Sequence, residues 1–196
     1  MDNLQPIAIA LGAAWASGLN LYATVLMLGI LGATGTITLP VQLETLTNPW
    51  VIGIAGFMYA VEFFADKIPA VDSIWDALHT FIRIPAGAVL AAAAVGPIDP
   101  VVQTMALLLG GVISAASHGT KMSARLSINA SPEPFSNWAA SISEDIGVFG
   151  GLYFALWHPI VFLCFLLVFV AIAAWLLPKL LRAIWGGISR LAALIR

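Results

Sequence analysis

Charge is scarce in this sequence of 196 residues: eight Lys or Arg and ten Asp or Glu make up 9% of it, whereas 61% is hydrophobic. A soluble domain of this length needs more polar surface to stay dispersed. Several apolar runs, above all residues 160–177, approach the roughly 20 residues that a helix needs to cross a bilayer. The composition therefore predicts an all-α polytopic membrane protein, because a barrel would show short alternating segments instead.

Other absences exclude classes of function. A basic tail is missing and the net charge is −2, which argues against nucleic-acid binding. The single cysteine, Cys164, cannot form an intrachain disulfide. The N-terminus has Asp2 and no Lys or Arg before its apolar run, so no signal peptide is expected. We find no HExxH, GxSxG or other nucleophile–base pattern, and expect no enzymatic activity, no cofactor and no metal centre.

Apolar runs and prolines predict about six transmembrane helices. Their approximate ranges are 6–31, 50–65, 83–95, 100–124, 137–157 and 159–178. The third is short, so residues 72–95 are better described as one helix, amphipathic at first and kinked near Pro85. Residues 179–196, after Pro178, are expected to form a basic amphipathic helix on the inner leaflet, with a solvated tail as the alternative.

The distribution of basic residues predicts the orientation. If the N-terminus is inside, six spans place all eight Lys and Arg residues on the cytoplasmic side. The outer loops then contain Glu44 and Asp99 and no basic residue. Loops rich in Lys and Arg stay in the cytoplasm. The sequence thus predicts a multi-pass protein of the bacterial inner membrane, surrounded by lipid, with both termini cytoplasmic.

A weak internal repeat appears at an offset of 98 residues. Residues 11–30 align with 109–128, both opening on Leu-Gly, and Asn20 aligns with His118. Identity is low, so chance is the alternative. The two segments are expected to run in opposite directions, which predicts a 3+3 inverted repeat: residues 1–98 (with an amphipathic segment at 68–83) and residues 99–178, followed by the terminal helix. Inverted repeats build transport sites near the membrane midplane, often on interrupted helices.

Ionisable residues recur at helical spacing. His118, Lys121 and Arg125 form a basic stripe, and carboxylates follow the same period in residues 62–83. The residues predicted to line an ion or solute pathway are Asn20, Thr24, Glu62, Asp66, Asp72, Asp76, His79, Arg83, His118, Lys121, Arg125, Glu144 and Asp145. Charged groups within spans face the protein interior, pair with each other and mark pathways. Snorkelling to the headgroups, the wet face of an interfacial helix and structural salt bridges are the alternatives.

Three segments carry a family resemblance: GLNLYAT, EFFADKIPAVDSIWDALHTFIRIPAGA and NASPEPFSNW. With them the chain resembles a bacterial family of uncharacterised membrane proteins, domain-of-unknown-function family 4126. The resemblance covers nearly the whole chain. It implies a membrane protein and brings no established activity, so the function rests on the residues themselves.

The leading hypothesis is a secondary transporter or ion-conducting protein with a charged cleft open to the cytoplasm. Its bases would neutralise a small anionic solute, while Glu62, Asp66 or Glu144 would exchange coupling protons. Divalent metal-cation transport is one alternative, since carboxylates are hard oxygen ligands, although the nearby bases count against it. A protein acting on lipid headgroups through His79 or His118 is another. The third is a non-catalytic accessory or structural subunit. A homo-oligomer is compatible with each hypothesis.

Overall fold

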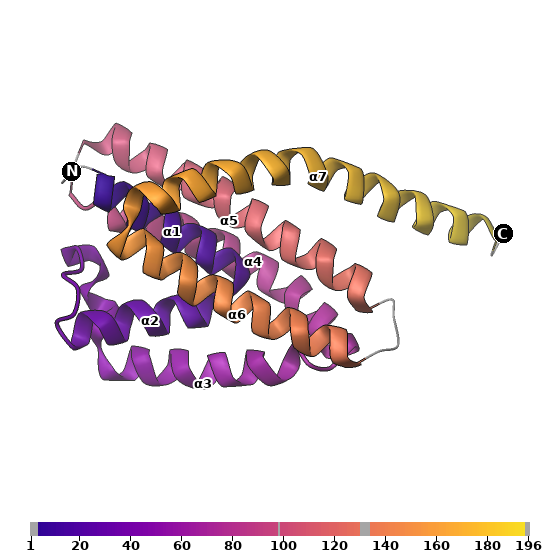
Figure 1. Cartoon of the computed structure of the whole chain (residues 1–196), viewed down its shortest axis with the longest axis horizontal. Coiled ribbons are helices and arrows are strands. Elements are labelled where there is room, and N and C mark those ends of the chain that lie inside the picture. Colours follow the sequence, from indigo (N-terminus) through magenta and orange to yellow (C-terminus); the bar gives the residue numbers. More distant parts are fainter. Residues whose placement is uncertain (1–3, 98, 130–133, 195–196) are drawn as a thin grey trace.

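The computed structural model describes residues 4–97, 99–129 and 134–194, and these contain helices and no strand (Figure 1). The elements are α1 (Leu4–Leu19), α2 (Leu21–Ala33), the 3-10 helix η1 (Val41–Thr47), α3 (Pro49–Ala65), α4 (Pro69–Ala94), α5 (Pro100–Asn129), α6 (Pro134–Trp157) and α7 (Pro159–Leu194). Three stretches are long and apolar enough to cross a membrane: Ala70–Ala94, Pro100–Asn129 and Pro159–Leu180. The all-α class is confirmed, whereas a count of six spans stays a prediction.

Residues 6–31 form two helices, which corrects the prediction of one span there. Asn20 separates α1 from α2 with an extended backbone, φ −148° and ψ 100°. Its side-chain Oδ1 accepts a hydrogen bond from the Ala23 amide at 2.9 Å, which caps the start of α2. The chain reverses direction there (Figure 1). Gln5 and residues 36–40 accordingly line the same pocket of about 560 Å³. We call residues 4–33 the hairpin, and Leu19, Asn20 and Leu21 its tip.

This reversal also changes the relation between the aligned segments. Gly18 of α1 lies against Ser117 and His118 of α5, so the two segments do meet at a similar depth. However, α1 and α5 run in the same direction along the bundle (Figure 1). The first and fourth predicted spans are therefore not related by inversion, because the first one turns back at Asn20 instead of crossing.

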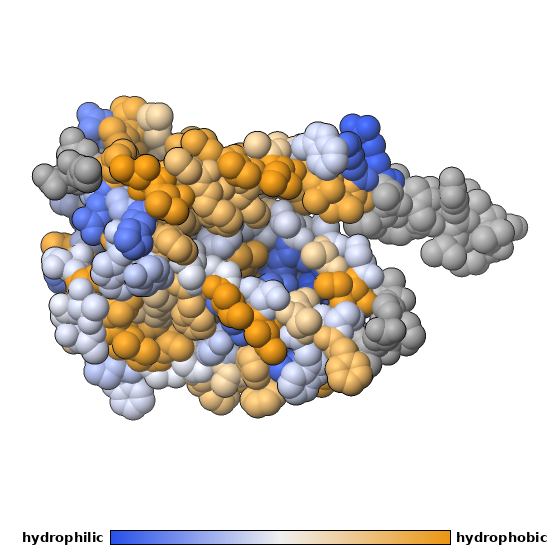
Figure 2. Space-filling model, in the orientation of Figure 1, coloured by the Kyte–Doolittle hydropathy of each residue, from blue (hydrophilic) through white to orange (hydrophobic). Residues whose placement is uncertain are grey.

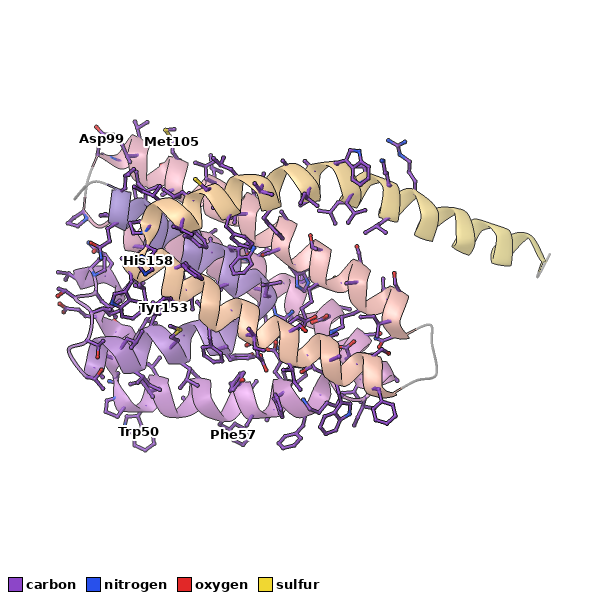
Figure 3. All side chains as sticks on the ribbon, viewed as in Figure 1. Trp50, Phe57, Asp99, Met105, Tyr153 and His158 are labelled. Carbon is purple, nitrogen blue, oxygen red and sulfur yellow. The ribbon has the colours of Figure 1, made fainter. Side chains whose placement is uncertain are left out.

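The two ends of the described chain lie at opposite ends of the bundle (Figure 1). We call the end of the bundle that holds Gln5 the hairpin end. The opposite end, towards which α7 runs, is the Lys67 end. Figure 3 shows Asp99 and His158 at the hairpin end. From α3 onwards five helices alternate in direction, and the hairpin adds no crossing (Figure 1). The prediction that both termini lie on one side assumed an even number of crossings, and the side of the membrane on which each end lies stays a prediction.

Two prolines lie inside helices. α4 continues through Pro85, as expected for residues 72–95. α7 continues through Pro178, so residues 179–194 continue the last helix and are not separated from it as the sequence predicted. A proline removes one helical hydrogen bond, and a helix can continue past it with a kink. The side chains beyond Arg182, including the other basic residues of this segment, lie outside the described residues.

The surface and the core have opposite characters. Large apolar side chains cover much of the outside (Figure 2), and Trp50 and Phe57 project outwards from α3 (Figure 3). Soluble monomers rarely show apolar patches of that extent, whereas lipid-facing helices require them. Inside, the Ser17 and Ser114 hydroxyls both donate to the Arg83 carbonyl, at 3.1 and 2.9 Å. These bonds hold α1, α4 and α5 together in the middle of the bundle.

Candidate functional site

The acidic and basic stripes come together in one group, which we call the charge cluster. Its members are Glu62, Asp66, Asp72, Asp76, Arg83, Lys121, Arg125 and Glu144. They belong to α3, its C-cap, α4, α5 and α6. Seven of these side chains are 4% exposed or less, and that of Glu144 is 15% exposed. The sequence thus identified residues that lie in contact although they are up to 82 positions apart in the chain.

Arg83 occupies the deepest position and is fully buried. Its guanidinium donates to Glu62 Oε1 and to Asp76 Oδ1, each at 2.7 Å. It also lies 3.3 Å from Nδ1 of His118. The Nε2 atom of the same ring lies 2.7 Å from Thr80 Oγ1. His118 thus joins Arg83 to Thr80 at the edge of the cluster.

Lys121 is the central cation. Its Nζ lies 3.3–3.6 Å from four carboxylates: Glu62, Asp66, Asp76 and Glu144. It also donates to the carbonyl of Leu19 at 3.2 Å, at the C-terminus of α1. A cation near the C-terminal carbonyls of a helix is favoured by the helix dipole. This one ammonium group therefore connects the charge cluster to the hairpin tip.

Arg125 closes the cluster towards the Lys67 end. It binds Glu144 through two hydrogen bonds of 2.8 and 2.9 Å, and Asp66 at 3.2 Å. Asp72 lies farther away, at 3.7 Å. The guanidinium also donates to the backbone and side-chain oxygens of Asn137, at 3.2 and 3.3 Å. A guanidinium that is forked between carboxylates in this way is held in a fixed orientation.

The remaining predicted residues lie around the cluster. Asn20 donates to Asp145 Oδ1 at 3.4 Å, and Thr24 donates to the Asn20 carbonyl at 2.9 Å. His79 stacks on Trp75, with ring centroids 4.2 Å apart, and its Nε2 lies 3.0 Å from the Tyr22 hydroxyl. Asn20 and Asp145 thus link the hairpin tip to α6. His79 instead contacts Tyr22 and Trp75, outside the charge cluster.

Acidic groups outnumber basic groups in the cluster. It holds five carboxylates and three bases, so two negative charges are in excess when all carboxylates are ionised. Four of the carboxylates each have one buried oxygen without a hydrogen-bond partner among the described residues: Glu62 Oε2, Asp66 Oδ1, Asp72 Oδ1 and Asp76 Oδ2. Uncompensated charge and unpaired oxygens in the interior cost free energy. The cluster is therefore suited to take up positive charge.

A metal ion fits this arrangement poorly. The described residues contain no group of three or more His, Cys, Asp or Glu side chains arranged to hold one. The three bases lie between the carboxylates, where their positive charges would repel a divalent cation. The described part of the cluster also encloses little space. A cavity of about 10 Å³, lined by Ser73, Asp76, Met122, Arg125 and Leu126, has room for about one water molecule.

The two stripes therefore close on each other and do not line an open cleft in the described residues. Figure 2 shows hydrophilic residues in a hollow between α5 and α6, framed by hydrophobic ones. Glu144, on α6, is the most exposed member of the cluster. Access to the cluster is therefore greatest beside Glu144.

Several polar residues of the site were not predicted. Asn137 is fully buried against Arg125, and Asn129 donates to Asp72 Oδ2 at 2.7 Å. Both are polar residues in a largely apolar chain, and this is the signal that could have found them. Tyr59, which hydrogen-bonds Asp145, carries no such signal, because aromatic residues are common in membrane helices.

Comparison with known proteins gives one result. A family model described as "Domain of unknown function (DUF4126)" matches residues 7–179, which include the hairpin tip and the whole charge cluster. No curated protein and no solved structure matches the chain. Because the match covers most of its length, the chain belongs to the DUF4126 family, as its sequence motifs indicate.

Proposed function

We propose that this protein is a membrane transport protein that moves protons through the charge cluster, either alone or coupled to a solute. The observation that carries the proposal is the excess of buried carboxylates over bases between apolar helices. Ionisable residues are expensive inside a membrane, and those of transporters form proton relays and ion pathways. The position of the hairpin tip beside the cluster adds support, since interrupted helices often bind the coupling ion.

A proton fits the cluster better than an anionic solute does. Arg83, Lys121 and Arg125 each contact at least two carboxylates, so an anion would have to displace them. The excess of carboxylates also makes the local potential negative, which attracts cations and repels anions. A proton needs no open cavity, because it passes between hydrogen-bonded groups. This matches the small size of the cavity beside Asp76.

The basic residues favour one orientation in a bacterial inner membrane. Lys67 follows α3, and Lys179 and Arg182 lie in the C-terminal half of α7, which runs towards the Lys67 end (Figure 1). Glu44 and Asp99 lie at the other end. By the positive-inside rule the Lys67 end faces the cytoplasm. The C-terminal part of α7 would then be cytoplasmic, and Leu4 would lie on the outer side.

Proton flux into liposomes tests the proposal. The purified protein is reconstituted with a trapped pH-sensitive dye, and a potassium gradient with valinomycin supplies the driving force. We expect proton uptake well above that of empty liposomes. Glu62→Gln should slow it about 100-fold, because positioned proton-transfer groups contribute factors of about 10²–10⁴.

The matched control is Glu44→Gln, which removes a carboxylate from η1 that is exposed at the hairpin end. It should leave the flux unchanged. The proposal is contradicted if liposomes that contain folded wild-type protein take up protons no faster than empty liposomes. It is also contradicted by a Glu62→Gln variant that keeps the wild-type rate.

The close pairing of the cluster favours a second function, that of an accessory membrane subunit. The 2.7 Å contact between Arg83 and Glu62 would then fix α4 against α3, and the contacts of Lys121 would fix α5 against both helices. Buried ion pairs can specify one arrangement of helices without adding net stability. In that case wild-type liposomes show no proton flux, and Glu62→Gln changes only the stability of the protein.

A further inference from the structure

We propose that Asp145 takes up a proton and thereby releases the hairpin tip from the charge cluster. The inference rests on the proposed function, because it names the residue that couples proton binding to a movement at that site. Its basis is the position of Asp145, which lies between the tip and α3 and has neutral hydrogen-bond partners on both sides.

The partners of Asp145 distinguish it from the carboxylates of the cluster. The amide of Asn20 donates to its Oδ1 at 3.4 Å, and the Tyr59 hydroxyl of α3 is its other hydrogen-bond partner. Among the described residues no Lys or Arg nitrogen lies within ion-pair distance of it, whereas every member of the cluster is in an ion pair. Asp145 therefore gains or loses a proton without breaking a direct ion pair.

Charges on the surrounding elements act on Asp145 from both directions. Glu62 of α3 and Asp66 at its C-cap oppose a negative charge at this position. Lys121 of α5 and Lys67, in the loop between α3 and α4, favour a negative charge there. Glu144 precedes Asp145 on its own helix. Protonation of a carboxylate in the charge cluster therefore changes the electrostatic potential at Asp145. The charge of Asp145 thus depends on the charge state of the cluster.

The contact with Asn20 transmits this charge to the tip. Asn20 has two tasks, since its Oδ1 caps α2 at the Ala23 amide while its Nδ2 donates to Asp145. An ionised carboxylate is a stronger acceptor than a protonated one. The contact is therefore stronger while Asp145 is ionised and weaker once it is protonated at lower pH. The tip is then held mainly by the bond from Lys121 to the Leu19 carbonyl, at 3.2 Å.

Hydrogen exchange measured by mass spectrometry on the full chain in lipid nanodiscs tests this inference. The readout is the protection of the amides of residues 17–24, corrected for the chemical exchange rate at each pH. In the wild type, protection should fall by about tenfold or more as the pH is lowered, the scale of one hydrogen bond to a charged group. Asp145→Asn should show the low protection at every pH.

Two variants make the result specific. Asp145→Glu keeps a titrating carboxylate and should keep the pH response, whereas Glu44→Gln removes an exposed carboxylate far from the tip and should behave as wild type. Protection that does not change with pH in the wild type, or an Asp145→Asn variant with the wild-type response, overturns the inference. If that happens while flux still depends on Glu62, only the coupling through Asp145 is lost. A pH-dependent tip in a protein without flux supports the coupling and removes the transport function.

Discussion

Replacing Lys121 with methionine should lower the free energy of unfolding by about 3–5 kcal/mol, the range found when one partner of a buried ion pair is removed. Methionine preserves much of the volume of the side chain, so the loss comes from charge. Four carboxylates lie within 3.6 Å of the Lys121 ammonium, and this variant leaves them with two bases among them. Unfolding of the protein in detergent micelles by added SDS, followed by circular dichroism, measures the effect.

Lys179→Met is the matched control. Lys179 is exposed on α7, with its Nζ 3.3 Å from the centroid of the Trp175 ring. Its loss should cost about 0.5–1 kcal/mol, the value of an exposed cation–π contact. The double variant Lys121→Met with Glu62→Gln should recover part of the stability, because it also removes one of the carboxylates left without its cation. Equal stability of the two lysine variants contradicts a buried, paired cluster.

Accessibility from the two sides of the membrane should differ completely between the ends of the bundle. In a Cys164→Ser background, a cysteine at position 44 should react with a membrane-impermeant maleimide added to intact spheroplasts. A cysteine at position 179 should react only after the membrane is opened. Glu44 lies in η1 at the hairpin end, and Lys179 lies in the C-terminal half of α7, which runs towards the Lys67 end. The positive-inside rule places the Lys67 end in the cytoplasm.

Cys164 is replaced so that it cannot contribute to the labelling, because it is exposed on α7. The reverse pattern of labelling would mean that the protein is inserted in the opposite orientation. Labelling of both positions from outside would contradict the odd number of crossings on which the topology rests.

The helical class and most of the site follow from the sequence for one physical reason. In a chain with 18 charged residues, groups such as Glu62, Arg83 and Lys121 must lie inside the protein or at the headgroups. Helical spacing places them on common faces, so their clustering was predictable. Their pairing was not, because it depends on how α3, α4, α5 and α6 are rotated about their axes. Sequence periodicity gives the face of each helix but not its partner.

The hairpin was missed because its composition matches that of a single span. Residues 6–31 form an apolar run of suitable length, interrupted only by small and weakly polar residues. The break at Asn20 depends on tertiary contacts: its side chain reaches Asp145, and Lys121 binds the Leu19 carbonyl. The prediction of the orientation assumed that this segment crosses the membrane once. Pro178 was expected to end the last helix, but α7 continues through it, because a proline inside a helix does not always end the helix.

The most direct test of a proton-carrying cluster is an infrared titration of the protein in nanodiscs, which observes the carboxyl groups themselves. If the excess carboxylates exchange protons, spectra recorded between about pH 5 and pH 9, where exposed carboxyl groups stay ionised, should show a carboxylic-acid band that changes reversibly with pH. Glu62→Gln or Asp145→Asn should reduce that band, and Glu44→Gln should not. A wild-type protein whose buried carboxyl groups keep one protonation state across this whole range would contradict the proposed function.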